Sequence, residues 1–400
     1  MAMLALGCNS LTGFSSLDKA DCVGGACGQG GAGGTGTGTG PGSGGAFPFG
    51  SIFTLNAGRH GTCLTLESNI GYCWGKHTGN AAAPFSTTPQ PIDGPKMPLV
   101  GQGFDHHCGL GEDGSFYCWG GNDRGQLGDG TRVTRMTPQK VEGLPEIERY
   151  SLAGDHTCVV APLGTEDPRV FCWGGNAYGE LGVGDQIDRD TPVELMGLGD
   201  VIRVSCGDGY TCAVRGSDGA LICWGRNEHG QLGLDPVTDP VVLTPTVIPG
   251  MPALERVYTS VDHTCGRTDG VKELTCWGRN DHGQLGDGTT TSRHTPQIVP
   301  EISNLNVAYL GTRHTCAADG ILDVLCWGAN DHGQLGATPS DTPVVVPQLL
   351  ASNVSVIACK AAEHTCWGFG QELLCAGLND SGQLGTGDYE PSDTPVMVSF

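Results

Sequence analysis

A twelve-residue stretch recurs along this chain of 400 residues and limits what the chain can fold into. Its fullest copy, residues 277–288, reads Trp-Gly-Arg-Asn-Asp-His-Gly-Gln-Leu-Gly-Asp-Gly. Six other copies, complete or degraded, begin with a tryptophan that the last one replaces by alanine: Trp74, Trp119, Trp173, Trp224, Trp327 and Ala376. The copies follow one another at intervals of 45 to 54 residues, so the sequence predicts a repeat architecture of seven units over residues 51–400.

Each unit contains four short apolar runs, which in the fifth unit cover residues 254–259, 263–267, 274–277 and 295–299. Their apolar residues alternate with polar ones, and Gly, Asp, Asn or Pro separates the runs, as is typical of strands joined by turns. Four strands per repeat of this length indicate a propeller blade, whereas a solenoid would need a helical pattern in each unit. We therefore predict an all-β, seven-bladed β-propeller of four-stranded antiparallel blades.

The repeat also resembles a known family. The succession is His-Thr-Cys at 263–265, Cys-Trp-Gly-x-Asn-x-x-Gly-Gln-Leu-Gly at 276–286 and Thr-Pro-x-x-Val at 295–299. It resembles the repeats of the regulator of chromosome condensation family over all of residues 51–400, and seven units match that family's seven-bladed propeller. Members include an exchange factor for a small GTPase, a plant ultraviolet receptor and a secreted bacterial β-lactamase inhibitor. The resemblance therefore implies a fold and leaves the function open.

The N-terminal segment differs in composition from the repeats. Ala5-Leu6-Gly7-Cys8 resembles a bacterial lipobox, in which Cys8 would be acylated, and residues 1–7 would be a partial signal-peptide remnant. Gly, Ser and Thr dominate residues 23–46, so we expect residues 8–50 to be a disordered Gly-rich tether that precedes the propeller. The alternative is an ordinary apolar N-terminus. Since no run of about 18 apolar residues occurs, we expect membrane contact only through a lipid anchor.

Fourteen of the 19 cysteines form one pair in every unit, with separations of 9 to 14 residues. Their spacing grows where the turn between two strands is longer, as expected for facing positions on antiparallel strands, which lie about 4.5–5.5 Å apart and within disulfide range. The predicted disulfides are Cys63–Cys73, Cys108–Cys118, Cys158–Cys172, Cys212–Cys223, Cys265–Cys276, Cys316–Cys326 and Cys366–Cys375. Such a density indicates an oxidising compartment, so the chain resembles the secreted or lipoprotein bacterial branch of the family.

Two other interpretations of these cysteines remain open: small buried apolar residues in a reducing cell, or zinc ligands together with a histidine such as His263. Structural zinc requires four ligands, usually with two closely spaced cysteines, and no unit offers them. Of the other cysteines, Cys22 and Cys27 are candidates to pair with each other. Cys206 and Cys359 occupy the same place in units four and seven, and their partners cannot be assigned from the sequence.

Five histidines lie two residues before the first paired cysteine of their unit, where unit four has Tyr210 instead: His106, His156, His263, His314 and His364. We expect each to satisfy backbone groups of the Gly-rich loop of its own unit. The loops at 122–130 and 280–288 offer at most two carboxylates each, fewer than calcium prefers. We therefore predict no metal and no cofactor.

The net charge of −22 argues against a nucleic-acid partner, because binding a duplex requires a basic footprint. The Gly-x-Ser-x-Gly motif of serine hydrolases, the phosphate-binding loop and the His-Glu-x-x-His motif of zinc proteases do not occur. We therefore expect no enzymatic activity. Loops after Gly-Gln-Leu-Gly differ between units, and variable loops on a rigid scaffold are where recognition usually occurs. The predicted partner-binding residues lie on that face: Asp105, Asp129, Asp155, Asp262, Asp287, Glu363 and Asp388.

These observations favour a monomeric, extracytoplasmic protein-binding module of a bacterial cell envelope or surface, lipid-anchored or secreted. Its predicted partner is another protein, one with a basic patch to complement the acidic chain. Two alternatives remain: a propeller-based enzyme such as a hydrolase or lyase, and a guanine-nucleotide exchange factor for a small GTPase.

Overall fold

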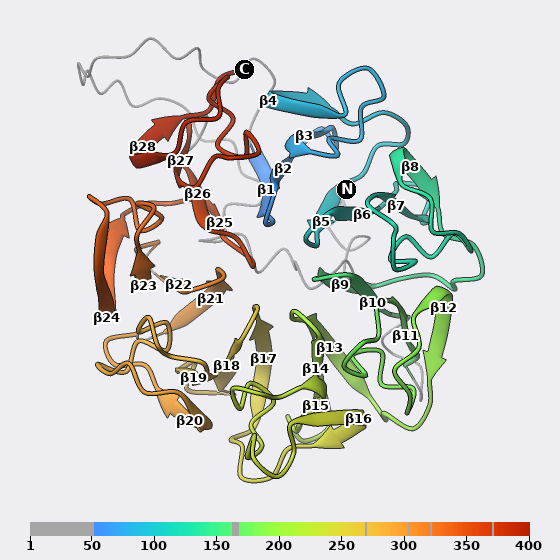
Figure 1. The fold of residues 1–400 in the computed structure, drawn as a ribbon, viewed down its shortest axis with the longest axis vertical. Coiled ribbons are helices and arrows are strands. Elements are labelled where there is room, and N and C mark those ends of the chain that lie inside the picture. Colours follow the sequence, from blue (N-terminus) through green and yellow to red (C-terminus); the bar gives the residue numbers. More distant parts are fainter. Residues whose placement is uncertain (1–51, 162–167, 269, 303, 321, 370–371) are drawn as a thin grey trace, which may run out of the picture.

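A computed structural model describes residues 52–161, 168–268, 270–302, 304–320, 322–369 and 372–400. The expectations for Cys8, Cys22, Cys27 and the segments 1–7 and 8–50 fall outside these residues. Within them lie seven four-stranded antiparallel sheets, arranged as a ring of blades around a central axis (Figure 1). The all-β, seven-bladed propeller predicted from the repeats is confirmed.

Each blade is built from four consecutive strands, and the first strand of each lies at the centre of the ring (Figure 1). These innermost strands are β1 (Ile52–Ala57), β5 (Leu99–Gln102), β9 (Arg149–Ala153), β13 (Val201–Cys206), β17 (Leu254–Thr259), β21 (Leu305–Leu310) and β25 (Val356–Ala358). The second strands are β2 (Gly61–Leu66), β6 (His106–Leu110), β10 (His156–Val160), β14 (Tyr210–Arg215), β18 (His263–Thr268), β22 (His314–Asp319) and β26 (His364–Phe369).

The third strands carry the repeated tryptophan: β3 (Gly71–Lys76), β7 (Phe116–Gly120), β11 (Val170–Gly174), β15 (Leu221–Arg226), β19 (Leu274–Gly278), β23 (Val324–Asn330) and β27 (Glu372–Gly377). The outermost strands are β4 (Phe85–Pro91), β8 (Arg135–Lys140), β12 (Arg189–Leu195), β16 (Val241–Val247), β20 (Arg293–Ile298), β24 (Ser340–Ala351) and β28 (Ser392–Met397). Each outermost strand contains a Thr-Pro step, and since proline cannot donate to a ladder, these edges resist pairing with another strand.

Register on the second and third strands places the paired cysteines directly opposite each other. Cys158 faces Cys172 even though six residues of the connection between their strands fall outside the described part, and Cys366 faces Cys375 across the shortest connection. All seven predicted pairs form disulfides, with Cα–Cα distances of 4.1 to 4.2 Å. Cys206 and Cys359 are free thiols, and both are fully buried.

The core lies mainly between neighbouring blades. Six of the seven tryptophans open a repeat, and each of these six is fully buried. Trp224 of the fourth blade, for example, packs against Val160 and Leu181 of the third. Burying a large aromatic side chain contributes roughly 2–3 kcal/mol, so the repeated tryptophan supplies a main cohesive contact between blades. The described part of the chain contains no helix long and apolar enough to cross a membrane.

Candidate interaction face

At five of the seven junctions a histidine connects one blade to the next. The Nε2 atom of each lies 2.8 to 2.9 Å from the hydroxyl of a threonine on the second strand of the following blade. The pairs are His106–Thr157, His156–Thr211, His263–Thr315, His314–Thr365 and His364–Thr62. Tyr210 makes the equivalent contact with Thr264, at 3.0 Å. The prediction that each histidine contacts the loop of its own unit is thus wrong, since the imidazole extends to the following blade.

The threonine, and not the histidine, contacts the Gly-rich loop of the preceding blade. Thr211 donates its hydroxyl proton to the backbone carbonyl of Glu180 at 2.8 Å, and the indole N–H of Trp224 donates to the same oxygen at 2.8 Å. Equivalent carbonyls at the Gln position accept both donors at four other junctions: Gln126, Gln231, Gln284 and Gln383. The fixed part of the repeat therefore serves to join blades.

The junction between the first two blades departs from this pattern because the first unit lacks the Gly-Gln-Leu-Gly segment. Gly61 takes the histidine position, and His107 takes the threonine position in the second blade. The ring of His107 stacks on Trp119 with centroids 5.5 Å apart, and its Nε2 lies 3.2 Å from the Lys76 carbonyl oxygen. Trp119 donates to the His77 carbonyl at 3.0 Å. The imidazole of His107 thus takes the place of the histidine–threonine pair found at five of the other junctions.

Three of the predicted partner-binding carboxylates organise their own loops. Asn122 donates to Asp129, whose carboxylate also accepts from Thr131 and pairs with Arg135 at 2.8 Å. The Asp287 side chain is 7% exposed and pairs with Arg293, and Asp388 accepts from Asn379 and Thr386. These hydrogen bonds give all three carboxylates a role within their own loops, and the Asp129 and Asp287 side chains are largely covered, whereas Asp388 is exposed.

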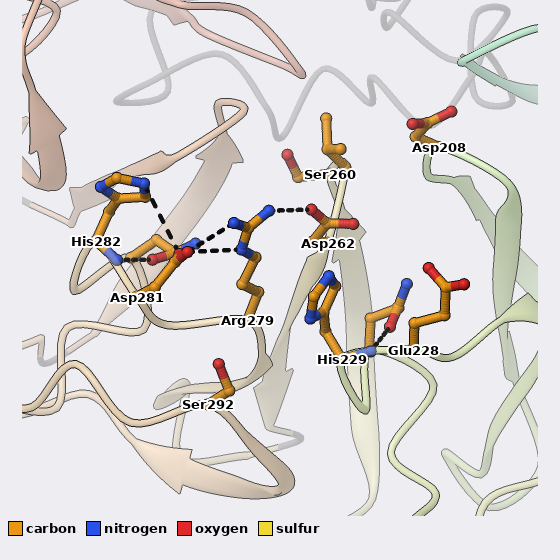
Figure 2. Close-up of polar contacts among 12 residues, drawn as sticks. Asp208, Glu228, His229, Ser260, Asp262, Arg279, Asp281, His282 and Ser292 are labelled. Atoms are coloured by element: carbon orange, nitrogen blue, oxygen red, sulfur yellow. Dashed lines mark hydrogen bonds and ion pairs between the residues drawn. The ribbon is translucent and has the colours of Figure 1, made fainter. Parts of the chain in front are cut away.

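The other four carboxylates lie in the turns between the first and second strands of their blades. Asp262 lies between two arginines, 3.0 Å from Arg226 and 3.0 Å from Arg279. Arg279 continues from Asp262 to Asp281, which it contacts at 2.6 Å (Figure 2). Glu363 pairs with Arg313 at 3.5 Å, and His332 lies 3.6 Å from it. Around blades five to seven, therefore, arginines compensate the acidic side chains.

The charges on blades two to four are compensated less. Partial desolvation raises the pKa of Asp155, although the residue is exposed, and the neighbouring carboxylates of Asp208 and Asp105 raise it further while Arg124 opposes them. Burial also raises the pKa of Asp208, although Arg226 opposes that shift. Among the described residues Asp155 has no ion-pair partner, and the Lys76–Asp105 pair, at 3.8 Å, is about two-fifths exposed on both sides. Exposed pairs contribute little, so this sector retains its negative charge.

Apolar side chains lie at the tips of the loops over the same three blades. Val133, Ile187 and Val237 are 55%, 65% and 86% exposed and follow the repeated loop motif of blades two, three and four. A branched apolar side chain held this far into solvent gains nothing in the free protein. We name Asp105, Asp155, Asp208 and these three tips the acidic sector.

Sequence reasoning missed two features of this face. Asp208 was overlooked because Gly209 occupies the position immediately before the aligned aromatic residue in blade four. Arg226 and Arg279 were overlooked although a repeat signal marks them, since each comes two residues after the tryptophan of its unit. The same position holds glycine in blades two and three, Gly121 and Gly175.

Comparisons with known proteins agree with the geometry. The model of the regulator of chromosome condensation (RCC1) repeat matches residues 113–160, 167–214, 218–268, 274–318 and 323–367. A second model of the same repeat matches residues 99–126 and 201–231. Together these matches cover more than half of the chain. The chain belongs to the RCC1 repeat family.

Relatives with curated descriptions extend well beyond the matched region. The chain is 29% identical to the human E3 ubiquitin-protein ligase HERC2 over 276 residues, which are 66% of this chain and 6% of the ligase. It is 30% identical to the Arabidopsis thaliana ultraviolet-B receptor UVR8 over 255 residues, 61% of this chain and 56% of the receptor. The chain thus spans about half or less of these relatives.

Solved structures show the same fold at low sequence identity. Prp20p from Saccharomyces cerevisiae superposes with a TM-score of 0.72 at 17% identity, covering 87% of this chain and 88% of Prp20p. Human WBSCR16 superposes with a TM-score of 0.61 at 20% identity, covering 88% of this chain and 83% of that one. At such identities the likeness establishes the fold alone.

Proposed function

We propose that this chain is a protein-binding module whose partner docks on the acidic sector. The observation that carries the proposal is the coincidence, on blades two to four, of weakly compensated carboxylates with exposed apolar loop tips. Asp155 has no ion-pair partner among the described residues, and the pairs of Asp105 and Asp208 are long, at 3.8 and 3.4 Å. Carboxylates that repel one another in the free protein gain most when a partner supplies cations. The apolar tips would provide the desolvated contacts around them. The partner's matching surface is therefore basic, with apolar residues at its margin.

Relatives lend support of a general kind. Solved structures similar to this chain include yeast RCC1 bound to Kap60, and Prp20p was studied for binding to Gsp1p and histones. These partners are proteins, which fits a binding role for the fold. Exchange activity on a small GTPase stays an alternative that family membership alone supports, and no single feature of the face favours it.

We further propose that the protein works outside the cytoplasm, in an oxidising compartment. Seven disulfides within one ring support this location, because such bonds persist where thiols are not kept reduced. The Cys8 segment makes a lipid anchor the proposed mode of attachment. Replacing Cys8 by Ser should release the protein from membranes. Unchanged membrane retention would refute the anchor.

The binding proposal is tested by neutralising the acidic sector with Asp105→Asn, Asp155→Asn and Asp208→Asn together. A matched control, Glu67→Gln with Glu142→Gln and Glu146→Gln, removes three exposed charges in the turns and linkers on the opposite side of the ring. Both variants should keep their far-ultraviolet circular dichroism. Pull-down from the native envelope should lose a specific protein with the first variant and retain it with the control. Equal retention by both would place the recognition surface elsewhere.

A further inference from the structure

Each of the two free thiols lies against the disulfide of the preceding blade. The Sγ atom of Cys206, in blade four, lies within 4.8 Å of Sγ of Cys158 and of a ring nitrogen of His156, both in blade three. Cys359 of blade seven lies within the same distance of Cys316 and His314 in blade six. All of these residues are buried. The arrangement therefore occurs twice in one ring, at the only two junctions with a described free cysteine.

Register places Cys206 beside the disulfide of the preceding blade. Cys206 pairs with Thr211 across the first two strands of its blade, a place that Ala57, Thr259 and Leu310 take in other blades. In blade two Gln102 occupies it and donates to Cys63 of the preceding disulfide at 2.6 Å. A residue at this position thus contacts the neighbouring blade's disulfide, and cysteine there becomes a nucleophile adjacent to it.

We propose that Cys206 and the Cys158–Cys172 disulfide form a thiol–disulfide exchange site that can replace an intra-blade bond by an inter-blade one. The Cys206 thiolate would attack Sγ of Cys158, forming Cys158–Cys206 while Cys158–Cys172 breaks. Cys172 leaves as a thiolate and takes up the proton that Cys206 lost. One disulfide and one thiol are present before and after, so the step requires no oxidant or reductant. The product joins blades three and four covalently.

The surroundings of Cys206 hold this reaction in check. Its thiol donates to the Ser151 carbonyl at 3.3 Å, and burial raises its pKa to about 11. Burial lowers the pKa of His156 to about 3, so the imidazole is neutral and a poor proton acceptor. Since the thiolate is the attacking species, exchange is slow near neutral pH and rises with the thiolate fraction.

One cation favours the Cys206 thiolate and so opposes the effect of burial. Lys360, from blade seven, spans the channel and donates to the Ser151 hydroxyl at 3.0 Å, and its charge lowers the pKa of Cys206. The neighbouring backbone N–H of Cys158 lowers that pKa as well and so favours the thiolate. No lysine acts on Cys359, whose pKa burial raises further than that of Cys206. Cys206 is therefore the more reactive thiol, and Cys359 is an internal comparison.

The test uses the full chain, incubated without thiols between about pH 7 and about pH 9, then quenched with acid, denatured and labelled with a thiol reagent that reacts at low pH. Peptide mapping should show label moving from Cys206 to Cys172, with a rate that rises about tenfold per pH unit. Label should move from Cys359 to Cys326 more slowly. Lys360→Met should slow the first exchange at every pH and leave the second unchanged.

Cys206→Ala, which installs the residue of the equivalent place in blade one, should abolish labelling of Cys172. Cys206→Thr, which installs the residue found at the equivalent position of blade five, serves the same purpose if the alanine variant folds poorly. Label that stays on Cys206 throughout this pH range in folded protein would overturn the proposal, as would label on Cys172 in either variant. Stoichiometric zinc binding after reduction, lost with His156→Gln, would instead assign the cluster to a metal and would also overturn it.

Discussion

His364 Nε2 lies 2.8 Å from the hydroxyl oxygen of Thr62, although 302 positions separate them in the sequence. Thr62 and Trp74 then donate to the carbonyl of Gln383 at 2.9 and 2.8 Å. The last blade thus meets the first through the same contacts that join consecutive blades. Among the described strands none is exchanged between blades one and seven. These side-chain contacts and a hydrogen bond from the Gly387 N–H to the Thr87 carbonyl at 3.0 Å therefore close the ring without a shared sheet.

Thr62→Val should therefore weaken this closure. The substitution keeps the shape of the side chain but leaves His364 without its hydrogen-bond partner, and it removes one of two donors to Gln383. An unsatisfied buried polar group costs about 1–3 kcal/mol, so the free energy of unfolding should fall by that order. Chemical denaturation measures the loss.

Thr315→Val is the matched control, because Thr315 makes the same contacts with His263 and Gln284 at a junction that the chain itself connects. Both variants should lose similar stability. Only Thr62→Val should speed amide hydrogen exchange in β1 and β28. If the two variants show the same exchange pattern, the closing junction is no weaker than the others.

Gly128→Ala should disrupt the junction between blades two and three. Gly128 has φ of 68°, and a Cβ there would lie 2.7 Å from Nε1 of Trp173, whose indole donates to Gln126. Left-handed backbone costs a non-glycine residue about 1–2 kcal/mol, and displacing a packed indole adds about 1–3 kcal/mol. Gly143→Ala is the control, since its φ of 79° is similar but no atom lies within 4 Å of the added Cβ. A thermal melt should therefore show a much larger loss for Gly128→Ala.

The repeat made the fold predictable from the sequence. Cysteine spacing that lengthens only within a turn indicated facing positions, and the register of Cys158 with Cys172 confirms this. Periodic features of this kind indicate local geometry, because every copy folds into the same four-stranded blade and packs its side chains in the same way. Seven independent copies also make chance agreement improbable.

Contacts between blades were harder to predict, because a single repeat says nothing about its neighbour. His156 and Thr211 occupy fixed places in their own units, yet their contact exists only when neighbouring blades pack together. The same limit applies to the face, where Asp155 and Asp262 hold equivalent positions but different environments. Asp262 forms ion pairs with Arg279 of its own blade and Arg226 of the preceding one, whereas Asp155 forms no ion pair among the described residues.

Acid should weaken the ring through its buried histidines. Burial lowers the pKa of His156, His314 and His364 to about 3, and that of His263 to about 4, from an ordinary value of 6.5. Between these values the unfolded chain binds protons that the folded chain does not. Stability is therefore complete above about pH 6.5 and falls as the pH drops toward about 4. The raised pKa values of Asp155, Asp208 and Glu180 act in the opposite direction over a narrower range.

His314→Tyr should reduce this dependence. Tyr210 is the natural occupant of the same position in blade four, and Gly207 lies beneath its ring as Gly311 lies beneath that of His314. The tyrosine keeps a hydroxyl for Thr365 but does not titrate in acid. Melting temperatures measured between about pH 7 and about pH 4 should fall less steeply than in the parent protein. An unchanged slope would show that other groups control acid unfolding.

Two equivalent carboxylates should respond oppositely to removal of their charge. The raised pKa of Asp155 means that its ionised form is unfavourable in the folded state, since partial desolvation and the carboxylates of Asp208 and Asp105 oppose it. Above its folded pKa this charge therefore destabilises the fold, and Asp155→Asn should raise the free energy of unfolding at neutral pH, by up to about 1 kcal/mol after allowance for solvent screening.

Asp262→Asn should instead lower the free energy of unfolding by about 1–3 kcal/mol, because it leaves Arg226 and Arg279 facing an amide at 3.0 Å where each had a carboxylate. Denaturant titrations of both variants at neutral pH measure the two signs, and added salt should shrink both differences. A charge that lowers stability in the free protein requires a role other than folding. If the Asp155→Asn variant is more stable and no longer binds the partner, that role is partner recognition. Destabilisation by Asp155→Asn would show that this carboxylate serves the fold, and the acidic sector would then lose its central member.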